Sequence, residues 1–321
     1  MLSKYFQIVS ICLYTSVATL VPQYAYAESN QLKAMKWVKR TTQSDIDNLI
    51  RPTITRAFTR KEKVLAEDII VDVVLDTNIS RVRAFSSNGG RKIEISTGFL
   101  SLISHMIDAN IVSNQFNKQS KLAAYNQTIS SFVTSYQDRV RREENSTWPV
   151  PFHTFVGIGD DIYNELYRSK QYDQVFSMSL RIVLSYILAH EFAHHVLGHL
   201  TVKKPSNLEE SRRNEDEADD FSIRINWILG NNPLAVANYF MLFTMVEGGL
   251  HEGSHSPSAC RLEKFLHAGI SFTESEMNNQ KNGSSGQMAN ALLELKRGRE
   301  MLKTECKKGD AMTNTTVPGL W

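Results

Sequence analysis

The segment from Tyr172 to Leu200 constrains the fold more than any other part of the sequence. Its apolar residues recur at helical spacing, so we predict one long, largely buried helix there. Near the end of this helix, His190 and His194 are four residues apart and therefore share one face. Two imidazoles placed in this way can bind one metal ion. The carboxylate of Glu191 lies to the side, where it can reach a water molecule on that ion and act as general base.

A catalytic zinc ion needs a third protein ligand and one open position. The extended pattern H-E-x-x-H-x-x-G-x-x-H does not supply that ligand, because Leu197 and Leu200 occupy its glycine and third histidine positions. On a continuing helix His195 and His199 point away from the histidine pair. We therefore expect these two histidines to lie at the surface or to support a ligand, without binding the metal themselves.

The acidic run from Ser211 to Asp220 offers a better third ligand. Glu215 and Asp219 are four residues apart and share one face of a second predicted helix. We predict that Glu215 completes a His-His-Glu site and that Asp219 accepts a hydrogen bond from a ligand imidazole. Asp216 and Glu217 are rival ligands from the same run. A solvated acidic helix face is the alternative interpretation of the whole segment.

Four passages occur in the same order as in a known family. One is H-E-x-x-H at His190 to His194, and another is the match of residues 211–219 to S-R-x-x-E-x-x-A-D. The stretch from Arg83 to Leu100 is similar to N-A-F-x-x-x-G-G-x-I-x-x-x-x-G-L-L, and S-H-S-P-S-A-C-R-L from Ser254 to Leu262 is similar to S-T-H-P-x-x-x-R-I/L. On these motifs the chain resembles the HtpX-like and CAAX-prenyl-protease-type zinc metallopeptidases, which are gluzincins.

The resemblance implies the composition of the site. It implies one zinc ion per chain, bound by His190, His194 and Glu215. It also implies that Glu191 is the catalytic base and that Asp219 supports the site or donates a proton.

The chain departs from the family pattern in two places. Arg83 stands where the family has asparagine, and the distance from Gly98 to His190 is longer than is usual. We interpret residues of about 106–168 as a helical, polar insertion. It would serve as a lid, as a docking element for a partner, or as an elaborated helical hairpin.

The sequence predicts an α+β fold, in which a mainly helical metallopeptidase domain carries a small antiparallel sheet near the H-E-x-x-H helix. Residues 28–321 are expected to form this single domain, with a disordered tail after about residue 307. Thr97 is expected to cap a helix at its N-terminus. The other expected elements are a helical region at 28–60 that is broken near Pro52, strands at 69–75, 81–85 and 92–95, and helices at 99–107, 234–246 and 287–303.

Residues 1–27 read as a signal peptide. Lys4 precedes an apolar stretch from Ile8 to Val21, and Ala25-Tyr26-Ala27 is a small-x-small cleavage site. Cys12 follows the bulky Ile11, which argues against a lipoprotein. We expect an exported, periplasmic protein, with secretion or a signal anchor as alternatives. We identify no other stretch long and apolar enough to cross a bilayer, so the mature chain is expected to have no transmembrane span.

Composition narrows the range of partners. The hydrophobic fraction of 42% and the charged fraction of 22% are ordinary for a globular enzyme. The net charge is +2, and the basic residues are dispersed, which excludes the clustered stripe of a nucleic-acid-binding protein. We expect polypeptide substrates, among them unfolded envelope proteins, and no nucleic acid.

Two cysteines remain after removal of the signal peptide. In an oxidising compartment Cys260 and Cys306 are expected to form one disulfide, and the alternative is a pair of buried thiols. Neither has a general base beside it in the sequence, so neither is expected to be a nucleophile.

These features predict a zinc-dependent endopeptidase in which Glu191 activates a zinc-bound water and the substrate lies extended along an edge strand. His255 is the candidate oxyanion stabiliser, with His251 and Arg261 behind it. His255 could instead occupy the fourth zinc position or be a hydrogen-bonded loop histidine. The alternative function is a zinc-stabilised, proteolytically silent, chaperone-like binding module of the envelope. A third hypothesis is a zinc hydrolase acting on non-peptide amides or cell-wall peptides.

Overall fold

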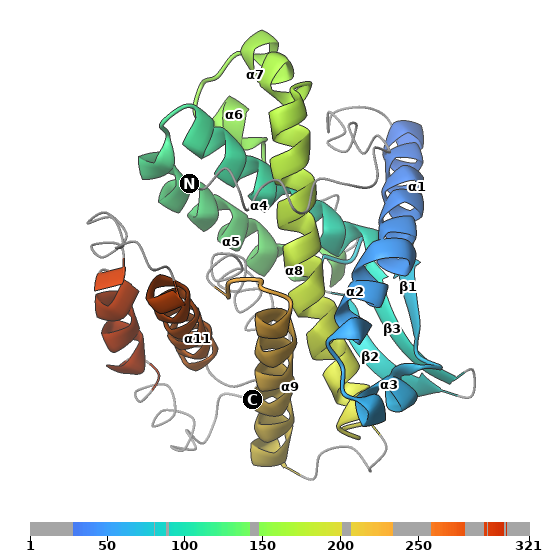
Figure 1. Ribbon diagram of the computed structural model, residues 1–321. Coiled ribbons are helices and arrows are strands. Elements are labelled where there is room, and N and C mark those ends of the chain that lie inside the picture. The colour runs from blue at the N-terminus through green and yellow to red at the C-terminus, as the bar shows by residue number, and fades with distance from the viewer. Residues whose placement is uncertain are drawn as a thin grey trace, which may run out of the picture.

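The structure is a computed structural model that describes residues 28–79, 81–87, 90–141, 148–200, 207–233 and 258–279, and residues 292–306 except 294 and 305. Within these ranges the chain is mainly helical and has one three-stranded sheet, which confirms the predicted α+β class (Figure 1). The signal peptide, the helix at 234–246, His251, His255 and the tail after residue 307 lie outside the described residues.

The first helical segment changes its winding before a proline. Helix α1 (Glu28–Asp45) continues as a π-helical turn, η1 (Ile46–Ile50), and then as α2 (Arg51–Arg56). Pro52 lies in the first turn of α2, where its missing N–H leaves no helical hydrogen bond unmade. The short helix α3 (Arg60–Ala66) follows and begins with a capping box between Thr59 and Glu62. The sequence therefore predicted the helical character of this region and a break near Pro52, but not the separate helix α3.

The sheet contains β1 (Ile70–Val74), β2 (Val82–Ser87) and β3 (Gly90–Ser96) in the order β1-β3-β2. Strands β2 and β3 form the predicted antiparallel hairpin. Strand β1 pairs with β3 in parallel, so the sheet is mixed and the expected antiparallel sheet is corrected in this respect. Strand β3 is the central strand, and its Ile93 and Ile95 are both fully buried. The segment after β1 must therefore pass the end of β3 before β2 begins.

The junction between β3 and α4 (Thr97–Gln115) is tightly bonded. The N-cap is Ser96, whose Oγ accepts a hydrogen bond from the Phe99 amide at 3.1 Å, and not the predicted Thr97. The Thr97 hydroxyl instead donates to the carbonyl of Asp76 at 2.9 Å. At Gly98, a side chain would overlap the backbone of Thr77. This part of the chain fixes the sheet against α4.

Between α4 and the long central helix, the described residues form α5 (Gln119–Arg141), α6 (Phe152–Phe155) and α7 (Asp160–Tyr167). The segment predicted as an insertion is therefore helical, as expected. Helix α5 packs on α4 and contributes Tyr125 and Ile129, both fully buried, to the common core. This packing is what the helical-hairpin interpretation requires.

Helix α8 (Lys170–Val196) runs through the centre of the molecule, with α5 on one side and the sheet with α1 to α3 on the other, while α4 passes behind α8 from the sheet toward α5 (Figure 1). His195 is buried, and its Nε2 lies 3.0 Å from the carbonyl oxygen of Lys92 on β3. His195 therefore joins this helix to the sheet and does not lie at the surface. Among the described residues, α8 is long and apolar enough to cross a membrane, contrary to expectation, but most of its apolar stretch is buried in the protein.

Helix α9 (Leu208–Ile228) packs along α8, and α11 (Ser258–Asn279) packs on α9. Helix α8 ends at Val196, earlier than predicted, and Gly198 follows with a φ of 85°. Helix α9 ends where Gly230 adopts a φ of 75°, which agrees with the predicted stop. Helix α11 was not predicted. It nevertheless completes the surroundings of the site.

Candidate metal centre

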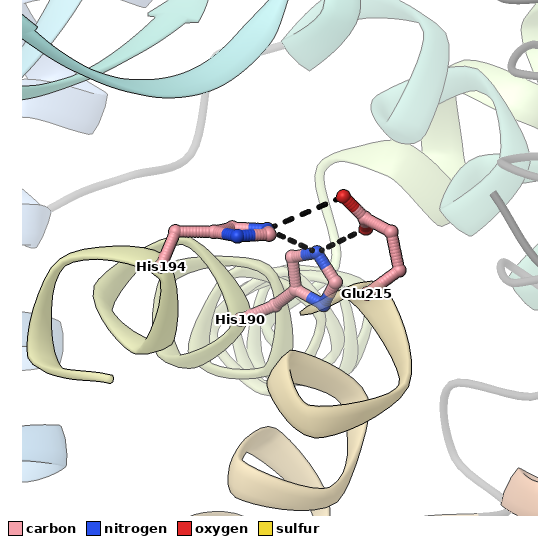
Figure 2. A group of neighbouring side chains, drawn as sticks. All are labelled: His190, His194 and Glu215. Carbon is pink, nitrogen blue, oxygen red and sulfur yellow. Dashed lines mark hydrogen bonds and ion pairs between the residues drawn. The ribbon is translucent and has the colours of Figure 1, made fainter. Parts of the chain in front are cut away.

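Three predicted ligands converge where α8 and α9 pack together. The Nε2 atoms of His190 and His194 are 3.2 Å apart. A carboxylate oxygen of Glu215 lies 3.1 Å from the Nε2 of His190, and the other lies 3.6 Å from the Nε2 of His194 (Figure 2). All three side chains point to one place from two helices. They are the group in the described residues whose donor atoms are close enough to share a metal ion.

These distances allow the three side chains to share one metal ion. Zinc, for example, binds histidine nitrogen and carboxylate oxygen at about 2.0–2.2 Å, so neighbouring donor atoms of a tetrahedron are about 3.3–3.6 Å apart. The two Nε2 atoms are 3.2 Å apart, and they lie 3.1 and 3.6 Å from the two different carboxylate oxygens of Glu215. Three protein ligands of this kind leave a fourth position for water or substrate, which is the pattern of catalytic zinc sites.

His190 lies between two carboxylates. Its Nε2 faces Glu215, and its Nδ1 lies 3.0 Å from an oxygen of Asp219. Burial alone would lower the pKa of His190, but the hydrogen bonds and charges of Asp219 and Glu215 raise it to about 10. The surroundings of this imidazole therefore favour a positive charge, which a proton or a metal ion can supply.

Asp219 is completely buried and is held by Arg261 of α11. The guanidinium Nε and one terminal nitrogen donate to the two carboxylate oxygens, each at 2.8 Å. Burial alone would raise the pKa of Asp219, but the charges and hydrogen bonds of Arg261 and His190 hold it below its usual range. Asp219 thus contacts the imidazole as predicted. The side chain of Arg261, expected behind His255 as an oxyanion stabiliser, is instead directed to Asp219.

His194 contacts a second histidine at the edge that faces away from the cluster. Its Nδ1 lies 3.1 Å from the Nδ1 of His199, and the Nε2 of His199 lies 3.2 Å from an oxygen of Glu217. The prediction that His199 points away from the histidine pair is wrong, because α8 ends at Val196 and the chain turns back at Gly198.

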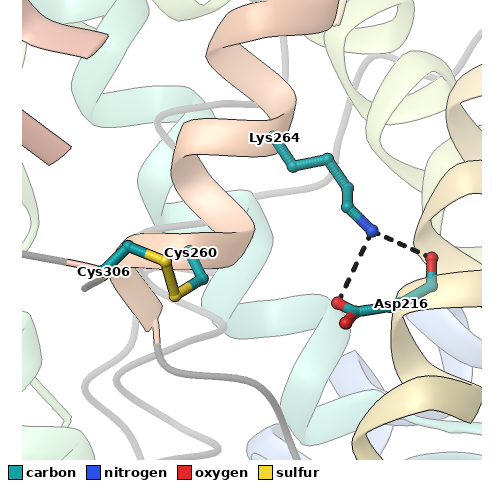
Figure 3. Close-up of a disulfide and its surroundings, with 4 residues drawn as sticks. All are labelled: Asp216, Cys260, Lys264 and Cys306. Atoms are coloured by element: carbon teal, nitrogen blue, oxygen red, sulfur yellow. Dashed lines mark hydrogen bonds and ion pairs between the residues drawn. A yellow bond between two sulfur atoms is a disulfide. The ribbon is translucent and has the colours of Figure 1, made fainter. Parts of the chain in front are cut away.

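The two rival ligands of the acidic run have other partners. The carboxylate of Glu217 contacts His199 at 3.2 Å. Asp216 contacts Lys264 of α11, whose ammonium group lies 3.5 Å from the carboxylate and 3.0 Å from the backbone carbonyl (Figure 3). Of Glu215, Asp216 and Glu217, Glu215 is the one whose carboxylate lies beside the Nε2 atoms of both His190 and His194.

Of the remaining predicted catalytic residues, the structure describes Glu191 but not His255. Glu191 is buried on α8, directly after His190, and on a helix its side chain is rotated by about 100° from that ligand. Its role as base stays a prediction. His255 lies outside the described residues, and so does His251.

Helix α11 is attached to two other parts of the chain near its N-terminus. Lys264 contacts α9 through Asp216 and Asp220, and a disulfide joins Cys260 to Cys306 with a Cα–Cα distance of 4.6 Å (Figure 3). This is the pairing predicted from the sequence. Because Cys260 directly precedes Arg261, the bridge lies in the helical turn that supports Asp219.

Support of a ligand was one of the two roles expected of His199, but its contact with His194 was not predicted, and neither was the contact of Arg261 with Asp219. The glycine at position 198 was the available signal for the first, since glycine commonly follows a helix end. The arginine of the S-H-S-P-S-A-C-R-L motif was the available signal for the second.

Comparison with known proteins identifies the class. The described residues are mainly helical and carry a His-His-Glu cluster on two packed helices. Residues 99–280, which include every described residue of the cluster and its supports, match the family model of Peptidase U49. The match spans more than half of the chain, and the chain therefore belongs to this peptidase family. No curated protein matches it, and no solved structure does.

Proposed function

We propose that the chain is a zinc-dependent endopeptidase of the gluzincin type. The observation that supports this most directly is the convergence of His190, His194 and Glu215, with donor separations of 3.1 to 3.6 Å. Membership of a peptidase family supports the reaction class. The motifs shared with HtpX-like enzymes support a zinc ion bound by two histidines and one glutamate.

Each side chain then has a defined task. When bound, zinc supplies a Lewis acid that polarises the scissile carbonyl and acidifies a water molecule. Glu191 accepts the proton of that water and transfers it to the leaving amine. Asp219 holds the imidazole of His190 with its Nε2 directed at the cluster, which makes Asp219 a positioning residue in this scheme. Stabilisation of the oxyanion remains assigned to His255.

The sheet suggests where an extended substrate lies. At the β1 edge the side chain of Gln43 already bonds the strand, donating to the carbonyl of Val71 at 2.9 Å and accepting from the amide of Val73 at 2.7 Å. Strand β2 is the opposite edge and lies near α8. A polypeptide that adds to β2 would have its backbone recognised without regard to sequence. We therefore place the substrate along β2.

We also propose that the enzyme is exported and works in the periplasm on envelope or misfolded polypeptides. The sequence of residues 1–27 supports export. The bridge between Cys260 and Cys306 supports an oxidising compartment, since disulfides persist there.

The proposal is tested with casein as substrate. Wild type and Glu165→Gln, a matched control at an exposed position on α7, should cleave it, and chelation should stop cleavage until zinc is restored. Glu191→Gln should bind zinc equally well and cleave nothing. Equal cleavage by Glu191→Gln would refute the assignment of the base. Zinc binding by wild type without hydrolysis of casein or of unfolded outer-membrane protein would favour the silent chaperone-like module.

A further inference from the structure

His199 is buried beside the metal centre although it lies beyond the end of α8. Its side chain is 6% exposed, and its ring meets that of His194 edge to face, with 5.2 Å between the ring centres. The turn at Gly198, with a φ of 85°, directs the chain back after Val196. His199 is therefore placed at the edge of the His194 imidazole that faces away from Glu215 and His190.

If His194 binds a metal ion through its Nε2, only one direction is possible for the hydrogen bonds along this edge of its ring. The Nε2 of His194 faces the other two donors and must present a lone pair to bind a metal ion. The proton of the neutral His194 ring is then on Nδ1, which donates to the Nδ1 of His199 at 3.1 Å. The proton of the His199 ring is consequently on Nε2, which donates to Glu217 at 3.2 Å. The chain of donors runs from His194 through His199 to Glu217.

We propose that His199 and Glu217 form a positioning pair that orients His194 and makes its Nε2 a stronger metal donor. The inference rests on the proposed zinc function and goes beyond it. The pair does for His194 what Asp219 and Arg261 do for His190. Outer partners of this kind fix the tautomer and ring angle of a ligand, and their loss costs about 10- to 100-fold in metal affinity.

The two members of the pair contribute unequally. The side chain of Glu217 is 50% exposed and lies 3.8 Å from Arg213, so solvent and a second partner both weaken its hold on His199. His199 is largely buried and contacts the ligand itself. Removal of His199 should therefore weaken zinc binding more than neutralisation of Glu217.

Zinc affinity, measured by competition with a chelator on the full chain, tests the pair. We expect binding to be about 10- to 100-fold weaker in His199→Ala and to weaken less in Glu217→Gln. In His199→Asn the amide oxygen stands near the position of Nδ1 and can accept from His194, so this variant should recover most of the loss. His267→Ala on α11 and Glu209→Gln on α9 are matched controls at exposed positions and should bind zinc like wild type.

Cobalt in place of zinc provides a second readout. The visible absorption bands of the cobalt form should keep the intensity of a four-coordinate site in every variant, with a shift in position for His199→Ala. A change of coordination number would show that His199 is itself a ligand and would overturn the inference.

Two other results would also overturn it. They are unchanged affinity in His199→Ala, and an equal loss in the Ala and Asn variants. Failure of wild type to bind one zinc ion per chain would overturn the proposed function together with the inference. Normal binding by wild type combined with either of the first two results would overturn the inference alone.

Discussion

Arg261 and Asp219 form an ion pair with two nitrogen–oxygen distances of 2.8 Å, and both side chains are buried. They lie 42 residues apart in the chain and join α11 to α9. Asp219 also contacts the Nδ1 of His190 at 3.0 Å. The same carboxylate therefore links the packing of two helices to the orientation of a proposed ligand.

Arg261→Met should lower the free energy of unfolding by about 3–5 kcal/mol, because it leaves the Asp219 carboxylate buried without its cation. Arg261→Lys should recover little of this, since an ammonium group cannot form the two parallel bonds of a guanidinium. Urea unfolding in the presence of chelator measures the effect without a contribution from metal. Arg60→Met, at an exposed position, is the control and should change stability by less than about 0.5 kcal/mol. A similar small change for Arg261→Met would contradict the prediction.

Glu215→Ala should abolish tight zinc binding, because two imidazoles alone leave the site one ligand short. Asp216→Ala should bind one zinc ion per chain like wild type, since the Asp216 carboxylate contacts Lys264. Metal content after dialysis against a weak chelator distinguishes the two. The assignment of the third ligand fails if Glu215→Ala keeps its metal and Asp216→Ala loses it.

Gly98→Ala should destabilise the protein, although alanine favours helix formation over glycine by up to about 1 kcal/mol. The added methyl group would overlap the backbone of Thr77, and such overpacking costs about 1–3 kcal/mol. The steric cost should prevail because a backbone carbonyl cannot move aside as a side chain can. Gly298→Ala is the matched helical control, with nothing near the new methyl group, and should stabilise slightly. Thermal unfolding should show a lower melting temperature for Gly98→Ala and a slightly higher one for Gly298→Ala.

His105 should make the protein less stable in acid. Burial lowers its pKa to about 4, whereas the unfolded chain takes up this proton near pH 6.5. Between these values the unfolded state binds more protons than the native state, so stability falls as the pH falls from 6.5 to 4. The loss should be roughly 3 kcal/mol, at 1.36 kcal/mol for each pH unit. This loss of stability is complete below pH 4 and nearly absent above pH 7.

The variant His105→Phe keeps a ring against Trp148, on which His105 stacks at 5.5 Å, but it does not titrate. The free energies of unfolding of wild type and variant should depend on pH in the same way above pH 7. Between pH 6.5 and 4 the free energy of wild type should fall more steeply than that of the variant. Parallel curves over that whole window would show that His105 does not contribute.

Local patterns predicted most of the elements that build the centre. Helical spacing predicted that His190 and His194 share one face of a helix and that Glu215 and Asp219 share a face of a second helix. This was possible because the i to i+4 relation depends only on backbone geometry. The β2–β3 hairpin was equally local. The parallel pairing of β1 with β3 was missed, because strand order depends on which strand buries more apolar surface. That choice is settled by the whole core and not by the strand's own residues.

The contacts that support the centre were missed for two physical reasons. The apolar spacing of α8 continues past Val196 and outweighed the signal of Gly198, so the helix was predicted to continue and His199 was not predicted to turn back onto His194. The contact of Arg261 with Asp219 joins two helices across 42 residues. Between Ser96 and Thr97, both good capping residues, the choice was made by a bond from Thr97 to Asp76, which spacing does not reveal.

The docking of α11 also sets the balance of charge at the centre. Helices α8 and α9 carry both imidazoles and Glu215, yet without α11 the Asp219 carboxylate has no guanidinium to balance its charge. Any event that separates α11 from α9 would therefore remove that balance while every proposed ligand stays in place.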